Sequence, residues 1–240
     1  MTAAPGRAST EYAEVPTRTS TIPRPATRRI VLWRHGRTAW NSQMRFQGQT
    51  DIPLDDTGRE QARWAAARLA ALAPEAIIAS DLQRAADTAA VLSSVTGVPV
   101  QLDPGLRETY AGAWQGRTAT ELAETDGEVY AAWLRGEPDV RPGGGETRWE
   151  VAARTSEALK RGLAGVGPGG TLVAVTHGGA ARTAVAMLLA LPVECWGVLG
   201  GLSNCCWSVL LEDVRRGPGA WRLEEHNAGS LPEPVLTEEG

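Results

Sequence analysis

The feature that most constrains the fold is an alternation between short apolar runs and segments with helical periodicity. Such an order of strands and helices favours a largely parallel sheet covered on both faces. We therefore predict an α/β fold in three layers, α/β/α, with a mostly parallel sheet. The expected strands cover 29–33, 76–79, 98–102, 171–176, 205–211 and 221–225.

Two of the helices can be placed from their expected caps and buried stripes. Residues 57–60 (Thr-Gly-Arg-Glu) and 80–83 (Ser-Asp-Leu-Gln) have the spacing of capping boxes, which predicts that helices begin there. Small and apolar side chains then recur at helical spacing. They are Ala62, Ala66, Leu69 and Ala73 after the first box, and Leu82, Ala86, Ala89 and Leu92 after the second.

Three other segments depart from this rhythm. Residues 1–28 are rich in Thr, Ser, Pro and Ala, too polar to offset the entropy of ordering, and indicate a disordered leader. Residues 230–240 read as a flexible tail. Residues 117–150 are polar, with weak helical patterns and the run Pro-Gly-Gly-Gly at 142–145, and predict a short lid insertion. One catalytic domain is therefore expected over 29–229.

Composition excludes several classes of function. The 24 basic and 28 acidic side chains give a net charge of −4, whereas a general nucleic-acid binder carries a basic excess. No stretch reaches the roughly 20 apolar residues of a membrane span, and the N-terminus lacks an apolar signal segment. We expect no nucleic-acid partner, no membrane and a cytoplasmic location.

Histidine and cysteine are scarce, which limits the chemistry available. Three histidines and three cysteines cannot build a His-rich metal centre, a disulfide scaffold or a paired zinc site. We expect no metal and no cofactor, in a reducing compartment. His226 is predicted to be a structural hydrogen bonder, and adjacent Cys205 and Cys206 to face opposite sides of a strand.

Charged and histidine side chains follow the ends of four predicted strands. Arg34 and His35 follow the first strand, Arg84 lies in the helix after the second, Glu108 follows the third and His177 the fourth. Because ligands bind outside the carboxyl ends of the strands in open α/β sheets, we expect these side chains to meet at one rim.

These residue types suit transfer of a phosphoryl group. A neutral imidazole, His35, can attack phosphorus, and the forks of Arg34 and Arg84 match phosphate oxygens. A protonated His177 and the backbone N–H of Gly178 at a helix N-terminus would add positive potential. Glu108 is expected to supply the proton for the leaving alkoxide.

The same segments resemble the histidine phosphatase superfamily, which includes the cofactor-dependent phosphoglycerate mutases. The resemblance runs from about residue 29 to 229 and rests on the motifs Leu-Trp-Arg-His-Gly-Arg-Thr at 32–38, Ser-Asp-Leu-Gln-Arg-Ala-Ala-Asp-Thr at 80–88, Leu-Arg-Glu at 106–108 and Thr-His-Gly-Gly at 176–179. It implies a phosphorylated nucleophile at His35, a phosphate pocket of Arg34, Arg84 and His177, and Glu108 as proton donor.

Other residues are expected to lie near the bound substrate. The resemblance implies that Asn41 and Gln47 line it, and Trp40 and Trp114 are expected to border it. The family usually has Glu or Gln where this chain has Arg37. Arg37 is interpreted either as an outward-facing replacement or as an added cation at the pocket mouth that would contact a second anionic group of the substrate.

Three functions remain open at this point. The short insertion resembles the phosphatase branch and favours a phosphomonoester hydrolase acting through phosphohistidine on a small phosphorylated metabolite. Local motifs, including 199–204 and 221–223, resemble phosphatases of a glucosylated phosphoglycerate. The alternatives are a cofactor-dependent mutase and a non-catalytic module that binds a phosphate ligand. A homodimer is a further expectation.

Overall fold

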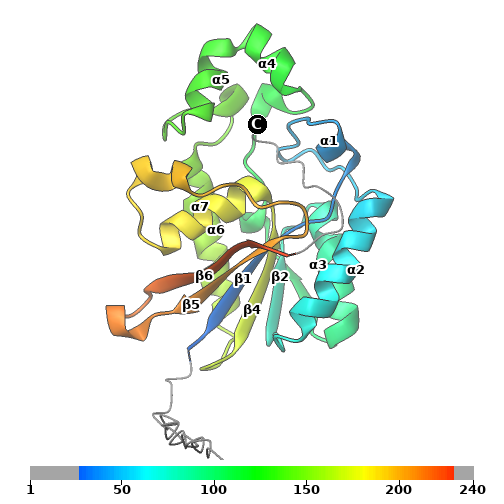
Figure 1. The fold of residues 1–240 in the computed structure, drawn as a ribbon, viewed down its shortest axis with the longest axis vertical. Helices are drawn as coiled ribbons and strands as arrows, with labels where there is room; N and C mark the ends of the chain where they lie inside the picture. The colour runs from blue at the N-terminus through cyan, green and yellow to red at the C-terminus, as the bar shows by residue number, and fades with distance from the viewer. Residues whose placement is uncertain (1–26, 230–240) are drawn as a thin grey trace, which may run out of the picture.

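The computed structural model describes residues 27–229 and contains a six-stranded mixed sheet (Figure 1). Its order is β3-β2-β4-β1-β5-β6, in which β3, β2, β4 and β1 are parallel and β5 and β6 add an antiparallel edge. The strands are β1 (Arg29–Arg34), β2 (Ala76–Ala79), β3 (Val100–Leu102), β4 (Thr171–Thr176), β5 (Trp207–Glu212) and β6 (Trp221–Ala228).

Helices cover both faces of the sheet, which confirms the predicted three layers. Helices α2 (Asp56–Ala70) and α3 (Gln83–Thr96) pack on one face, and α6 (Arg148–Leu163) and α7 (Gly178–Leu188) on the other (Figure 1). Helix α6 was not anticipated, and it begins inside the segment expected to form the lid.

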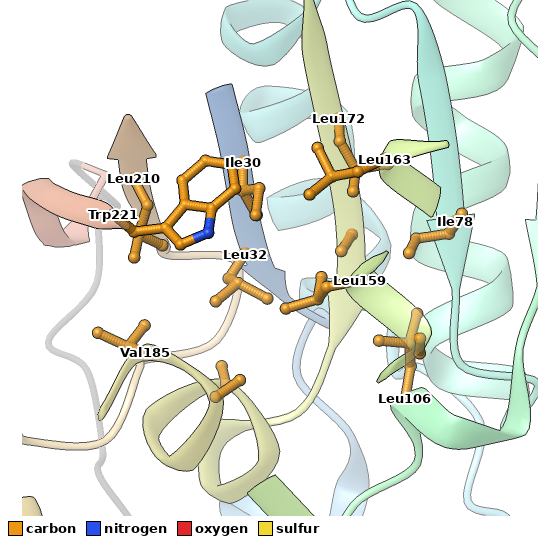
Figure 2. Close-up of a cluster of buried hydrophobic side chains, with 14 of the residues drawn as sticks. Ile30, Leu32, Ile78, Leu106, Leu159, Leu163, Leu172, Val185, Leu210 and Trp221 are labelled. Atoms are coloured by element: carbon orange, nitrogen blue, oxygen red, sulfur yellow. The ribbon is translucent and has the colours of Figure 1, made fainter. Parts of the chain in front are cut away.

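The interiors of the central strands β1 and β4 are apolar because each strand is buried on two sides. In β1, Ile30 and Leu32 point into the core beneath α6 and α7. Their neighbours Val31 and Trp33 point into the core beneath α2 and α3. Figure 2 shows the first of these cores, in which Leu159 of α6 lies beside Leu32. Strand β1 is thereby fixed at the centre, and the residues that follow it emerge at a rigid rim.

Both predicted capping boxes are wrong. Helix α2 begins at Asp56, and its N-cap is Asp55, which accepts a hydrogen bond from Gly58 N (2.7 Å). Helix α3 has no side-chain cap from its own N-cap residue, Leu82. Asp51, from a distant loop, accepts from Gln83 N instead (2.8 Å), since Asp81 is engaged by Arg107 (2.7 Å).

The predicted lid contains two short helices, α4 (Ala119–Thr125) and α5 (Gly127–Leu134), beyond the end of the sheet (Figure 1). They surround a small core of their own, in which Trp114, Leu122 and Tyr130 are buried and Phe46 packs alongside. Trp114 Nε1 also donates to Asp126 (2.7 Å). The lid is therefore held by packing as well as by its connections. Helix α1 is the single turn Ala39–Ser42.

The predictions for the leader and tail, for His226 and for the two adjacent cysteines have different outcomes. The leader and the tail fall outside the described residues, apart from residues 27 and 28, and Arg28 pairs with Glu212 (2.7 Å). His226 is a structural hydrogen bonder, as predicted, contacting Ser208 Oγ and the Gly200 carbonyl at 2.9 Å each. Cys205 and Cys206 are buried but precede β5, because Cys205 adopts a left-handed turn (φ 58°).

A pair of glycines lets the N-terminus of α2 lie directly against the loop after β1. A Cβ on Gly58 would lie 2.0 Å from the Arg37 carbonyl oxygen, and a Cβ on Gly36 would lie 2.3 Å from the Gly58 oxygen. Both neighbours are backbone atoms and cannot move aside cheaply. The loop that carries His35 is thus clamped between β1 and α2.

We predict that Gly58→Ala lowers the free energy of unfolding by about 1–3 kcal/mol, although alanine favours helices, because its methyl group overpacks this contact. Urea denaturation measures the change. Gly127→Ala is the matched control, since Gly127 also begins a helix and has no atom within 4 Å of an added Cβ. Equal stability of the two variants would contradict the prediction.

Candidate active site

Four of the five side chains predicted from the strand ends, all except His177, line one pocket between the rim of the sheet and the lid. Its polar part is formed by Arg34, His35, Arg84, Glu108 and Arg182. Its opposite wall comes largely from the lid and the loop before it, and includes Phe46, Tyr130, Trp133, Leu134 and Pro142. One end of the pocket is suited to an anion and the other to an apolar or ring-shaped group.

His35 is held as a neutral ring with one nitrogen directed into the pocket. Its Nδ1 lies 2.7 Å from the Gly36 carbonyl oxygen, which can only accept, so the proton belongs on Nδ1. Nε2 then carries the lone pair and accepts from Arg84 Nε (3.3 Å). Burial, and then the charges of Arg84 and Arg34, hold the pKa of His35 well below 6.5. The ring is therefore a nucleophile at neutral pH.

Two buried guanidinium groups flank this nitrogen. Arg34, at the end of β1, donates through Nη1 to the Leu202 carbonyl (2.6 Å). Arg84, in the first turn of α3, donates to the carbonyls of Gly48 (2.7 Å) and Thr50 (2.9 Å) and is fully buried. Backbone acceptors therefore hold both guanidinium groups in place, and the fork of a guanidinium matches two phosphate oxygens.

His177 is the N-cap residue of α7, and its ring centroid lies 5.1 Å from that of His35. The two rings meet because His35 N donates to the Thr176 carbonyl (3.0 Å), which continues the β1–β4 ladder. Both ring nitrogens of His177 are buried and have no hydrogen-bond partner within the described residues. Their hydrogen-bonding capacity is therefore unused in that part of the chain, although His177 itself does not line the pocket.

The surroundings that the protein itself supplies disfavour the expected positive charge on His177. Burial, followed by the charges of Arg84, His35, Arg154 and Arg34, holds the pKa of His177 well below 6.5. A neutral imidazole can still donate one hydrogen bond to phosphate. Protonation of this ring would require the added negative charge of a bound dianion.

Glu108 lies at the N-terminus of α7, on the loop after the 3₁₀ turn at Pro104–Leu106. Its carboxylate accepts hydrogen bonds from the backbone N–H groups of Thr109 (2.8 Å), Gly179 (3.0 Å) and Ala180 (3.0 Å). A Cβ on Gly179 would lie 2.7 Å from Glu108 Oε1, so a larger residue there would displace the carboxylate. Four separate backbone segments thus bring His35, Arg84, Glu108 and His177 close together.

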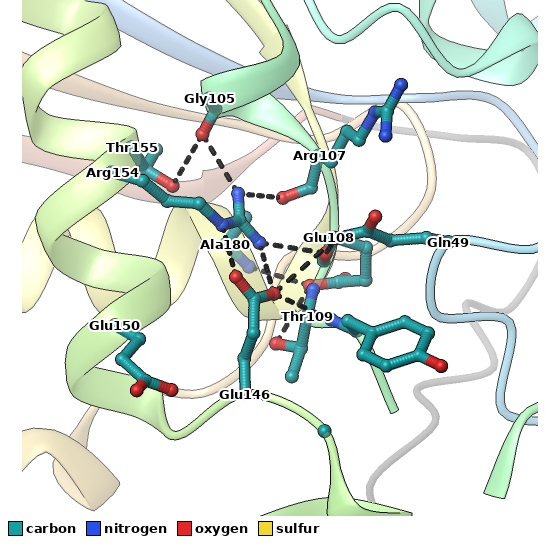
Figure 3. A network of polar contacts seen from close by, with 12 residues as sticks. Gln49, Gly105, Arg107, Glu108, Thr109, Glu146, Glu150, Arg154, Thr155 and Ala180 are labelled. Carbon is teal, nitrogen blue, oxygen red and sulfur yellow. Dashed lines mark hydrogen bonds and ion pairs between the residues drawn. The ribbon is translucent and has the colours of Figure 1, made fainter. Parts of the chain in front are cut away.

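Arg154 of α6 is the main residue that the sequence did not reveal. All five of its N–H groups are used: three reach the carbonyls of Gly105 (2.9 Å), Arg107 (2.6 Å) and Glu108 (2.9 Å), and two reach Glu146 (2.8 and 2.9 Å) (Figure 3). Glu146 in turn accepts from Tyr110 N (2.8 Å). One side chain therefore fixes the backbone on either side of Glu108.

Asn41 and Gln47 both lie within hydrogen-bonding distance of Thr38, which follows His35 by three residues. Asn41 Oδ1 accepts from Thr38 N (3.1 Å) and from Asn204 Nδ2 (3.2 Å). Asn204 also donates to the His35 carbonyl (3.2 Å), and the motif that contains it, after Gly-Gly at 200–201, was the only sequence signal for it. Gln47 lines the pocket and Asn41 does not.

Arg37 does not lie at the pocket mouth. Its guanidinium donates to Asp55 (2.9 Å) and to Thr57 Oγ1 (2.7 Å) at the start of α2, and it does not line the pocket. The expected contact with a second anionic group of the substrate is therefore wrong for Arg37, and the outward-facing interpretation describes its position. The carboxylate of Asp55 holds it there.

The structure also shows where three other predicted residues lie, namely Gly178, Trp40 and Trp114. Gly178 is the first residue of α7, so its N–H belongs to the helix N-terminus. A Cβ added to Gly178 would lie 3.5 Å from Arg34 Cζ. Neither Trp40 nor Trp114 lines the pocket, because Trp40 packs near Gly116 and Trp114 lies in the lid core. Trp133 is the tryptophan that does.

Comparison with known proteins identifies the class. The family model described as histidine phosphatase superfamily (branch 1) matches residues 30–229, and the chain belongs to this family. It is a histidine phosphatase, a phosphoric monoester hydrolase.

Two relatives and one solved structure show which members of the family the chain is similar to. The chain is 41% identical over 216 residues to glucosyl-3-phosphoglycerate phosphatase from Mycolicibacterium vanbaalenii, covering 85% of this chain and 96% of that protein. It superimposes with a TM-score of 0.77 and 39% identity on the structure of a mycobacterial glucosyl-3-phosphoglycerate phosphatase complexed with VO3, covering 84% and 100% of the two chains. It is 36% identical over 213 residues to "Probable phosphoglycerate mutase GpmB" from Cronobacter sakazakii, covering 87% and 97%.

Residues 27–229 offer neither a metal-binding cluster nor a membrane-spanning helix. No group of three or more His, Cys, Asp or Glu side chains there could hold a metal ion. No helix in that range is long and apolar enough to cross a bilayer.

We predict that Arg154→Lys lowers kcat by at least about tenfold, since lysine has three donors on one atom and cannot hold all five acceptors, which releases the Glu108 backbone. Steady-state phosphate release measures the loss. Arg161→Lys is the control, because Arg161 also lies on α6 but pairs at the surface with Asp103 (2.8 Å). A similar kcat for both variants would refute a positioning role for Arg154.

We also predict that stability falls as pH drops from about 6.5 to 5.5. The depressed pKa values of His35 and His177 mean that the unfolded chain binds protons in this window while the native rings stay neutral. Each ring contributes up to about 1.4 kcal/mol per pH unit. Urea denaturation across the window measures the slope, and it should flatten in the double variant His35→Asn, His177→Asn. An unchanged slope would contradict the prediction.

Proposed function

We propose that this chain hydrolyses a phosphomonoester through a phosphohistidine at His35, and that its substrate is glucosyl-3-phosphoglycerate or a related sugar or glycerate phosphate. The observation that carries the proposal is the neutral His35 ring, whose Nε2 lone pair lies beside two buried arginines. Such a nitrogen can attack a phosphate that the same arginines hold.

In the first step, His35 Nε2 attacks phosphorus and the P–O bond to the alcohol breaks. The electron pair leaves with the alcohol oxygen, which takes a proton from the carboxylic acid form of Glu108. Arg34 and Arg84 stabilise the charge on the three equatorial oxygens, and His177 and the N–H of Gly178 contribute hydrogen bonds. The products are the free alcohol and phosphorylated His35.

In the second step, water attacks phosphorus and gives a proton to the Glu108 carboxylate. The P–Nε2 bond breaks and its electron pair returns to the ring, which restores neutral His35 and releases inorganic phosphate. The hydrogen bond from Nδ1 to the Gly36 carbonyl keeps the proton on Nδ1 throughout, so the same nitrogen serves in every cycle. We assign Gln47 to the substrate side of this site, and Asn41 to support of the loop that carries His35, through Asn204.

The choice of substrate is supported by two observations. The relative with 41% identity is named glucosyl-3-phosphoglycerate phosphatase, and the similar mycobacterial structure carries the same name. The pocket also joins a cationic end to an aromatic wall that contains Tyr130 and Trp133, a surface suited to a sugar ring. The mutase alternative is less well supported, since the relative so named is 36% identical.

The proposed reaction uses only groups of the protein and water, so we propose a metal-independent enzyme without a cofactor. Three free cysteines, two of them buried, suit the reducing conditions of a cytoplasm. The partner is a small phosphorylated molecule, not a nucleic acid or a membrane. We retain a homodimer as a proposal.

A screen of phosphate release tests the assignment. We expect kcat/KM for glucosyl-3-phosphoglycerate to exceed that for glucose 6-phosphate and for 3-phosphoglycerate by at least about tenfold, because binding energy from both halves of the molecule is used in the transition state. Equal turnover of all three would contradict the substrate. Interconversion of phosphoglycerates that depends on 2,3-bisphosphoglycerate would instead indicate the mutase.

Trapping the intermediate tests the mechanism separately. Brief exposure to 32P-labelled substrate should leave an acid-labile label on the wild-type protein that is absent from His35→Ala. Absence of both label and phosphate release across the panel would favour a module that only binds its ligand.

A further inference from the structure

A second cavity adjoins the phosphate pocket. It has a volume of about 250 Å³ and shares three lining residues with the pocket, namely Trp133, Leu134 and Arg182. Its other walls include Arg148, Thr183 and Trp196. The two hollows therefore lie side by side, with side chains at the end of α5 and on α7 between them.

Arg182 lies at the junction of the two hollows and is 7% exposed. It stands on α7 three and four residues after Gly179 and Gly178, on the same face of the helix. Long side chains on a helix lean toward its N-terminus, which here is the turn that binds Glu108. Its guanidinium is thus close to the reacting groups without being one of them.

The second cavity favours a negatively charged group. Two of its lining side chains are guanidinium groups, and none of its lining residues is Asp or Glu. Arg148 is stacked on Trp133, with its Cζ 4.1 Å from the ring centroid, and donates to the Trp133 carbonyl (2.8 Å). Arg148 therefore orients the indole between the two hollows, while Arg182 faces both of them.

The same cavity has flat aromatic walls. Trp133 and Trp196 both line it, and Trp196 is itself held by stacking against Trp149, with ring centroids 5.8 Å apart and an angle of 17° between the planes. Indole faces pack well against the C–H face of a sugar ring, and arginine donates to hydroxyl and carboxylate oxygens.

We propose that Arg182 binds the carboxylate of the substrate, and that the cavity beyond it, between Trp133 and Trp196, receives the glucosyl ring. The assignment rests on the proposed function and adds the residues that select the substrate. In a glucosylated 3-phosphoglycerate the carboxylate is bonded to the same carbon that carries the sugar. A carboxylate held at the junction therefore directs the sugar away from phosphorus.

Substrates that differ by one group test the assignment. Arg182→Met, which keeps the length of the stem, should lower kcat/KM for glucosyl-3-phosphoglycerate and 3-phosphoglycerate at least tenfold more than for glycerol 3-phosphate, which lacks the carboxylate. Trp196→Ala should lower kcat/KM for the glucosylated substrate alone. An equal fall on all three substrates in Arg182→Met, or no fall, would overturn the role of Arg182.

A measurement on the wild-type protein keeps the test valid if a variant misfolds. Glucosylglycerate should inhibit hydrolysis of p-nitrophenyl phosphate at least tenfold more strongly than glucosylglycerol, which lacks the carboxylate. Equal inhibition would overturn the proposal.

The two proposals fail in different ways. If glucosyl-3-phosphoglycerate is not the preferred substrate, the comparison of 3-phosphoglycerate with glycerol 3-phosphate still measures the preference for a carboxylate. If it is preferred and Arg182→Met leaves this preference unchanged, only the role of Arg182 fails.

Discussion

The hydrogen bond between His35 Nδ1 and the Gly36 carbonyl is the interaction on which the rest of the site depends. It leaves the lone pair on Nε2, and burial among arginines keeps the ring neutral. Both conditions require that the loop after β1 stays rigid and dry. The buried central strand supplies one support for that loop, and the close approach of Gly36 and Gly58 supplies the other. The sheet and the helix packed against it therefore hold the imidazole of His35 in place.

A second constraint is that the acid group must be positioned without a rigid strand beneath it. Glu108 lies on an irregular loop, and backbone N–H groups at the start of α7 hold its carboxylate. Arg154 binds the carbonyls of that loop from the other side and joins them to Glu146, at the end of the lid. The loop, the lid and two helices thus share one network of hydrogen bonds (Figure 3).

Much of this arrangement was predictable from the sequence. The parallel order follows from alternating strands and helices, and Arg34, His35, Arg84, Glu108 and His177 come together because the carboxyl ends of parallel strands lie at one rim. What was missed depends on partners distant in the sequence. Asp55 both caps α2 and holds Arg37, Arg154 binds mostly backbone carbonyls, which carry no sequence signal, and the neutrality of His177 results from burial.

The loop before β5 gives the pocket a dependence on the order of synthesis. The Leu202 carbonyl accepts from Arg34, and Asn204 donates to the His35 carbonyl, across separations of 168 and 169 residues. The chain grows from its N-terminus, so the nucleophile is among the first parts of the domain to leave the ribosome and its supports are among the last. The catalytic loop consequently matures only when nearly the whole domain has been made, and a chain truncated before this loop retains the motif of a phosphatase without a completed site.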